Sequence, residues 1–167
     1  AVIGIDQDAD ALAAAGARLA PYGGRFRPVR ANFAEILDVL CEQNIPQVDG
    51  VLLDIGVSSY QLDTPERGFS YMSDGALDMR MDRRNGATAA DLLAKLSAEE
   101  LADIIYKYGE EKFSHRIAQR IVAAREQQPI TGTLQLAEIV AGAIPSKARR
   151  VEKQHPAKRT FQALRIA

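Results

Sequence analysis

Apolar and polar positions predict a strand, a helix and a second strand at the start of the chain. Residues 1–5 form a short apolar run that ends at Asp6, and an alanine-rich stretch with helical propensity follows over residues 8–19. Residues 21–24 predict a turn, and residues 26–31 predict the second strand.

A second helix and a third strand are predicted next. Asn32 is followed three residues later by Glu35, a capping-box pattern that predicts a helix running through Leu40. Residues 50–54 form another apolar run, and this run ends at Asp54.

The three predicted strand ends are spaced by roughly 24 residues, which suits right-handed crossovers between parallel strands. We therefore predict an α/β fold with a doubly wound parallel sheet in this part of the chain.

The pattern becomes helical after a long loop, predicted to be ordered, over residues 64–85. Ser97 and Glu100 form a second capping box, and Gly109 stands where a glycine would end that helix at its C′ position. The apolar positions then predict an all-helical module over residues 87–146. They are Leu101, Ile104, Ile105 and Tyr108 on one helix, Phe113, Ile117 and Ile121 on the next, and residues 134–144 on a third that stops at Pro145; a last helix is predicted from Thr160.

Composition restricts the class of protein. The chain has 167 residues, 47% of them hydrophobic and 26% charged, which suits one globular domain or two small modules. The pattern predicts no membrane span and no signal peptide, so we expect a soluble, cytoplasmic protein. One cysteine, Cys41, and two histidines cannot furnish the usual zinc ligand sets, and no metal site is predicted.

Charge differs between the two parts of the chain. Residues 1–63 hold 4 Lys and Arg against 9 Asp and Glu, whereas residues 64–167 hold 17 against 13. Residues 147–165 hold 7 basic residues, Lys153 among them, and a single acid, Glu152. This stretch indicates a polyanionic partner.

Candidate ligand residues follow the predicted strands. An acid at the carboxyl end of an early strand, here Asp6, commonly binds the ribose hydroxyls of a nucleoside cofactor, although Asp6, Asp8 or Asp10 could equally serve as the acid at a helix N-terminus. Phe33 would lie over the same crevice and could cover an adenine ring or be a core contact. These positions suggest a cofactor that contains adenosine.

The loop after the third predicted strand is the second candidate. Asp54 and the polar residues up to Gln61 lie at the sheet edge where ligands of open α/β folds bind. The alternative is a loop that only caps the next helix.

Six basic residues are candidates for RNA contacts, because phosphates need cations held in place. The alternative is a solvated basic surface. The candidates are Arg80, Arg83, Arg84, Lys158, Arg159 and Arg165.

Six blocks of sequence, in order from end to end, closely resemble the bacterial MraW-type methyltransferases that act on cytosine N4 of 16S ribosomal RNA. The blocks are IDQD (residues 5–8), DGVLLDIGVSSYQLD (49–63), RGFS (67–70), LDMRMD (77–82), YGEE (108–111) and HPAKRTFQALRI (155–166).

The resemblance implies a Rossmann-like class I methyltransferase that uses S-adenosyl-L-methionine, with an inserted helical subdomain for RNA recognition. It implies a methyltransferase domain over residues 1–86, the insertion over 87–154 and a return segment over 155–167. Asp6 would bind the ribose, Phe33 would lie beside the adenine, and Asp54 and Gln61 would be further cofactor contacts. The target would be the N4 amine of a cytidine in the decoding region of the small ribosomal subunit.

Two departures from the family pattern matter. The family's glycine-rich loop before Asp6 and its strands after Ile166 are missing from these residues, so we interpret the chain as an internal fragment that is inactive alone. Residues 54–57 do not match the proline-containing loop of many amino-methyltransferases. A catalytic role for Asp54 is therefore a hypothesis, and a structural or cofactor-side role is the equal alternative.

Two other functions stay open. A non-catalytic RNA-binding or ribosome-assembly module would explain the basic stretch, and a nicotinamide-dependent Rossmann enzyme would also place Asp6 on a ribose.

Overall fold

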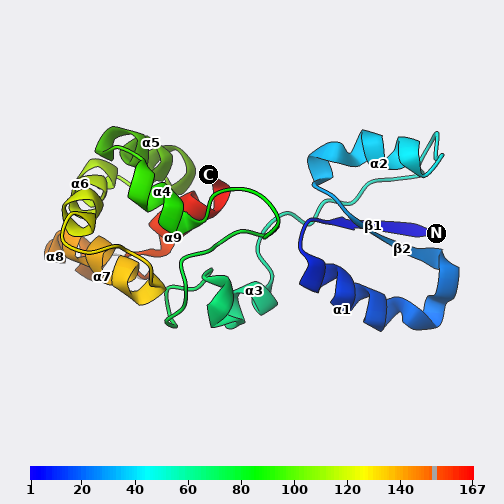
Figure 1. The fold of residues 1–167 in the computed structure, drawn as a ribbon, viewed down its shortest axis with the longest axis horizontal. Helices are drawn as coiled ribbons and strands as arrows, with labels where there is room; N and C mark the ends of the chain where they lie inside the picture. Colours follow the sequence, from blue (N-terminus) through cyan, green and yellow to red (C-terminus); the bar gives the residue numbers. More distant parts are fainter. Residues whose placement is uncertain (152–153) are drawn as a thin grey trace. The chain divides into compact units, whose positions relative to one another are not determined.

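The chain divides into two compact units in the computed structural model, which describes residues 1–151 and 154–167 (Figure 1). Unit 1 comprises Ala1–Ile55 and Met81–Asn85, and unit 2 comprises Gly56–Arg80 and Gly86–Ala167. Glu152 and Lys153 of the predicted basic stretch lie outside the described residues.

Unit 1 is built on a strand–helix–strand motif, as predicted. Strand β1 (Val2–Asp6) pairs in parallel with β2 (Phe26–Arg30), in a register that sets Val2 opposite Phe26 and Asp6 opposite Arg30. Helix α1 (Ala9–Leu19) connects them through the 3-10 helix η1 (Ala20–Arg25). The Asp8 carboxylate accepts the Asp10 amide at 3.0 Å and so caps α1.

The predicted capping box after β2 is confirmed. The Asn32 side chain accepts the Ala34 amide at 3.0 Å, and the Asn32 amide donates to the Glu35 carboxylate at 3.0 Å. This box begins the 3-10 helix η2 (Phe33–Glu35), which continues into α2 (Ile36–Glu42). Figure 1 shows α1 and α2 on opposite sides of the two strands.

The predicted third strand is wrong for this structure. Residues 50–54 have no regular secondary structure and pair with no strand among the described residues. A strand exists only where a neighbour satisfies its backbone groups. Without one, the apolar run is exposed, with Leu52 at 93% and Val51 at 60%. The doubly wound sheet is therefore observed only as the pair β1–β2.

Unit 2 is helical, and its helices enclose the core of the described chain. Helix α5 packs against α6 and α9, α6 packs against α7, and α4 also contacts α6. The core contains fully buried residues such as Leu101, Ile117 and Phe161. The elements are α3 (Ser59–Asp63), η3 (Pro65–Arg67), α4 (Ala89–Lys95), α5 (Ala98–Gly109), α6 (Ser114–Arg125), α7 (Thr133–Ala143), α8 (Ser146–Val151) and α9 (Lys158–Ile166).

The helical predictions for this region are confirmed except at one helix end. Ser97 and Glu100 form the capping box that begins α5. Gly109 is the last residue of α5 rather than its C′ residue, and Glu110 takes the left-handed conformation (φ 52°). The glycine serves close packing instead, because a Cβ atom at Gly109 would lie 2.5 Å from the Arg159 carbonyl oxygen.

The predicted long loop is ordered in unit 2 by hydrogen bonds to the start of α7. The Leu77 amide donates to the Thr131 carbonyl at 2.9 Å, and the Thr133 hydroxyl donates to the Ser73 carbonyl at 2.7 Å. The Gly75 amide in turn donates to the Thr133 hydroxyl oxygen at 2.9 Å. The last five residues of the predicted loop, Met81–Asn85, belong to unit 1.

The division into units differs from the predicted domain boundary after residue 86. Residues 56–80 and 155–167 belong to the helical unit, where α9 packs on α5. The domain division inferred from the family, including a return segment over residues 155–167, stays a prediction. No helix in the described part of the chain is long and apolar enough to cross a membrane.

We predict opposite effects of two glycine substitutions on the free energy of unfolding. Gly109→Ala pushes a methyl group into the backbone of α9 and should destabilise the protein by about 1–3 kcal/mol. Gly142→Ala is the control, because Gly142 lies in α7 with open space around its Cα, and alanine is favoured there by about 0.5–1 kcal/mol. Urea unfolding measures both values, and equal stability of the two variants would contradict the packing role of Gly109.

Candidate functional site

Asp6 lies where the sequence predicted it, at the carboxyl end of β1. Its side chain is half-buried, and its Oδ1 atom accepts the Asp8 amide at 2.8 Å. Its carbonyl accepts the Ala31 amide at 3.2 Å, which continues the β1–β2 pairing past the strand end. The carboxylate is thus held at the edge of the parallel pair, and no hydrogen bond to its Oδ2 atom is found within the described residues.

An ion cluster lies at the same edge of unit 1. The Arg30 guanidinium donates to Asp82 Oδ1 at 3.0 Å, and Arg84 donates to both carboxylate oxygens, to Oδ2 at 2.6 Å from Nη2. The Gln7 carbonyl accepts Arg30 Nε at 3.3 Å, and the Gln7 amide nitrogen lies 3.6 Å from Met81 Sδ. Because Arg30 is the register partner of Asp6, these contacts hold residues 81–84 next to the predicted ribose-binding acid.

The charges of this cluster reinforce one another. The Arg84 side chain and backbone amide hydrogen-bond to Asp82 and hold the pKa of that carboxyl well below its usual range, and the Arg30 charge adds to the effect. Asp82 also raises the pKa of Arg84. Asp82 and Arg84 therefore stay ionised at neutral pH.

Phe33 follows β2 by three residues and is 50% exposed, so it is not the core contact that was its alternative interpretation. It begins η2, directly after the capping residue Asn32. An exposed aromatic ring close in sequence to the end of β2 offers a face for a flat ligand.

The predicted residues Asp54 and Gln61 have different environments. Asp54 is exposed in the irregular segment of unit 1, and no strand positions it. Gln61 is 4% exposed in unit 2, where its Oε1 atom accepts the Ser58 amide at 2.9 Å and completes the capping box of α3. Gln61 thus caps α3, whereas its role as a cofactor contact stays a prediction.

Four of the predicted RNA-contact residues are engaged within the protein. Arg80 makes a two-pronged contact with the Asp78 carboxylate at 2.7 and 3.0 Å, and Arg84 binds Asp82 as described. Arg159 donates to the Glu110 carbonyl at 3.0 Å, and Arg165 donates to the Phe69 carbonyl at 2.7 Å. Burial lowers the pKa of Arg165.

Arg83 and Lys158, which are also predicted RNA contacts, lie at exposed positions. Lys158 stands at the first position of α9.

Sequence reasoning missed the structural role of Asp82 and Arg30. Asp82 ends the block LDMRMD, which was interpreted only as a family motif and, for Arg80, as a candidate RNA contact. Pairing across 52 residues, as between Arg30 and Asp82, has no local sequence signature.

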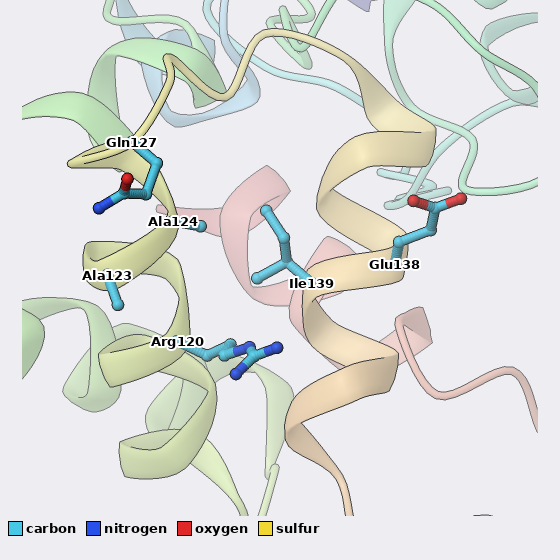
Figure 2. A pocket seen from close by; sticks show the side chains of 6 residues that line it. All are labelled: Arg120, Ala123, Ala124, Gln127, Glu138 and Ile139. Atoms are coloured by element: carbon cyan, nitrogen blue, oxygen red, sulfur yellow. The ribbon is translucent and has the colours of Figure 1, made fainter.

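A groove between α6 and α7 is separate from these candidates. Arg120, Ala123, Ala124 and Gln127 line one wall and Glu138 and Ile139 line the other, and Figure 2 shows Arg120 and Ile139 pointing into the space between the helices. Helix α6 ends at Arg125, so Gln127 lies just beyond it. None of the predicted site residues lines this groove. Within the described residues, no cluster of three potential metal ligands is found.

Taken together, the fold and the sheet edge define an α/β protein whose parallel strand–helix–strand unit carries an acid at the edge where ligands of such folds bind. The sequence profile of the MraW methylase family matches residues 1–167, and the chain belongs to this family.

Curated relatives carry the name ribosomal RNA small subunit methyltransferase H. The protein of Carboxydothermus hydrogenoformans is 54% identical over 165 residues, which cover 99% of this chain and 52% of the relative. That of Symbiobacterium thermophilum is 57% identical over 166 residues, which cover 99% of this chain and 52% of the relative. That of Geobacter sulfurreducens is 57% identical over 166 residues, which cover 99% of this chain and 53% of the relative. The chain thus spans about half the length of these relatives.

We predict that Arg84 controls the titration of Asp82. A depressed carboxyl pKa stabilises the folded state above the unfolded pKa, near 3.9, and this contribution is lost only as the pH falls toward the folded pKa. In a carbon-detected NMR titration, Asp82 should therefore stay ionised well below pH 3.9, and Arg84→Gln should move its midpoint upward. Arg27→Gln, an exposed arginine elsewhere on β2, should leave the midpoint unchanged. An unchanged midpoint in the Arg84 variant would contradict the ion cluster.

Proposed function

We propose that this chain is the cofactor- and RNA-binding part of a Rossmann-like methyltransferase that uses S-adenosyl-L-methionine. Its target is the N4 amine of a cytidine in the decoding region of 16S ribosomal RNA, in the small ribosomal subunit and therefore in the cytoplasm. The observation that carries the proposal is the Asp6 carboxylate at the carboxyl edge of the β1–β2 pair, in a chain of the MraW methylase family. The names of the relatives support an RNA substrate.

The residues at the sheet edge fit the adenosine part of this cofactor. A carboxylate accepts two O–H donors, which is the chemistry that ribose hydroxyls require, and no hydrogen bond occupies Asp6 Oδ2 within the described residues. The exposed ring of Phe33 would cover the adenine. Asp54 and Gln61 are further proposed contacts; for Gln61, the capping role in α3 means that its backbone or a rearranged side chain would make the contact.

Asp54 is the proposed catalytic residue. The bound cofactor supplies an electrophilic methyl group, whereas the cytosine amine is a weak nucleophile because its lone pair is delocalised into the ring. The exposed Asp54 carboxylate can accept a hydrogen bond from the amine and hold it in line for attack. The carbonyl groups of residues 55–57 would provide further acceptors, and Tyr60, 58% exposed, would offer a stacking face for the base.

RNA contacts are assigned to the six basic residues named above. Lys158 is exposed, and we propose that its side chain contacts an RNA phosphate. Arg80 and Arg84 would have to exchange a carboxylate partner for a phosphate, so their contribution to affinity is smaller.

Cofactor binding distinguishes this function from its alternatives. A non-catalytic assembly module would bind RNA without regard to S-adenosylmethionine, and a nicotinamide-dependent enzyme would bind NAD. The full-length protein should bind S-adenosylhomocysteine, fail to bind NAD and transfer methyl groups to small-subunit RNA.

Asp6→Asn should weaken binding of S-adenosylhomocysteine by at least about tenfold, because hydrogen bonds to a charged group are lost. Asp38→Asn, an exposed acid on α2, is the matched control and should bind as the wild type does. Isothermal titration calorimetry on the full-length protein measures both. Wild-type affinity in the Asp6 variant would remove this residue from the cofactor site.

Asp54→Ala should lower the methyl-transfer rate at saturating cofactor by roughly 100-fold while changing RNA affinity little, because the carboxylate acts on the reacting amine. Asp49→Ala, an exposed acid five residues earlier, is the control. Single-turnover methylation of small-subunit RNA gives the rate, and filter binding gives the affinity. Unchanged turnover in the Asp54 variant would show that this acid is not catalytic.

A further inference from the structure

Unit 2 carries a stacked pair of rings whose outer member is exposed. The rings of Tyr71 and His155 are 4.6 Å apart between centroids and tilted by only 13°. Tyr71 is half-buried and His155 is exposed, so Tyr71 is the inner ring of the pair and His155 is the outer ring. The two residues are far apart in sequence, and no local pattern indicates that they meet.

Helix α9 packs against Tyr71. The Tyr71 and Phe161 rings make a T-shaped contact, with centroids 5.5 Å apart and planes 83° apart, and Phe161 is fully buried. Two residues before Tyr71, the Phe69 carbonyl accepts a hydrogen bond from Arg165 at 2.7 Å. Phe161 of α9 therefore packs against the inner ring, and Arg165 of the same helix holds the backbone that leads to it.

The outer ring is held in one orientation by the chain that leads into α9. His155 Nδ1 accepts the Ala157 amide at 3.2 Å, and the His155 carbonyl accepts the Lys158 amide at 3.0 Å. Because Nδ1 is an acceptor, the proton of the neutral ring is on Nε2, which remains a donor on the exposed ring.

A cation stands close by in sequence. Lys158 begins α9 three residues after His155, and its side chain is exposed. An exposed aromatic residue near a cation can bind an unpaired nucleotide, because the ring stacks on the base while the cation contacts the phosphate.

We infer that the Tyr71–His155 pair is a stacking platform for one unpaired base of the RNA substrate. The outer face of His155 receives the base, and Lys158 contacts its phosphate. The inference rests on the proposed function for the nature of the polymer, but it assigns a contact apart from the cofactor edge of unit 1. It also explains why the His155 ring is held rigidly although it is exposed.

The test is the affinity of the full-length protein for an unstructured single-stranded oligoribonucleotide, measured by fluorescence anisotropy without cofactor. His155→Ala should weaken binding by at least roughly fivefold, the lower end of base–aromatic stacking. His155→Phe keeps a stacking face and should stay within about twofold of the wild type. His115→Ala, the only other histidine of the chain and exposed on α6, is the matched control and should have no effect.

Salt dependence separates stacking from charge. His155→Ala should leave the slope of affinity against salt unchanged, whereas Lys158→Ala should reduce it. Equal binding by the wild type and His155→Ala, or equally weak binding by His155→Ala and His155→Phe, would overturn the platform.

A second readout needs no variant and so does not depend on how the variants fold. An oligoribonucleotide that carries 2-aminopurine should lose fluorescence when it binds the wild type, because stacking on an aromatic ring quenches that base. Binding without quenching at any position of the label would contradict the proposal. Methylation of small-subunit RNA by the wild type is measured in parallel. Methyl transfer without stacking would disprove the platform but not the proposed function. Stacking without methyl transfer would disprove the proposed function but not the platform.

Discussion

The close packing of α9 on α5 is the contact on which the helical unit depends. It requires Gly109, because any Cβ atom there would meet the Arg159 backbone. The carbonyl groups at the end of α5 are then satisfied from α9: Arg159 donates to the Glu110 carbonyl and Gln162 donates to the Tyr108 carbonyl. An α-helix leaves its last carbonyls without intrahelical partners, so these two side chains cap α5 while they hold α9 against it. The same helix positions the Tyr71 ring, so one packing contact supports both the core and the proposed RNA platform.

Unit 1 is stabilised in a different way. Among its described residues, Val39 is the one apolar side chain that is buried, whereas Leu37, Leu52 and Ile55 are exposed. A two-stranded sheet with so little burial is marginal by itself, and exposed apolar residues in this number are typical of a surface that another element covers. The order at the carboxyl edge of the sheet comes instead from strand pairing and from the ion cluster around Asp82. That edge carries the proposed ribose-binding acid, so the proposed chemistry lies in the less well packed unit.

The candidate site could be predicted from the sequence as far as its residues depend on local structure. Asp6 follows an apolar run and stands at the end of a strand, as predicted, and the capping box at Asn32 places Phe33 directly after β2. Asp54 was predicted at a strand end that is absent, because strand formation needs a neighbour that the local pattern cannot supply. Predicted RNA contacts such as Arg84, Arg159 and Arg165 are engaged with partners in the protein, which no charge count reveals.

The sequence by itself determined the secondary structure of the helical region, the strand–helix–strand start and the family. Amphipathic periodicity and capping boxes are local properties, and six ordered blocks of residues suffice to identify relatives. Only the tertiary structure decided which distant residues meet: Arg30 with Asp82, Gly109 with Arg159, and Tyr71 with His155. Each of these contacts joins segments at least 50 residues apart, and its existence depends on how the elements pack rather than on the pattern within either segment.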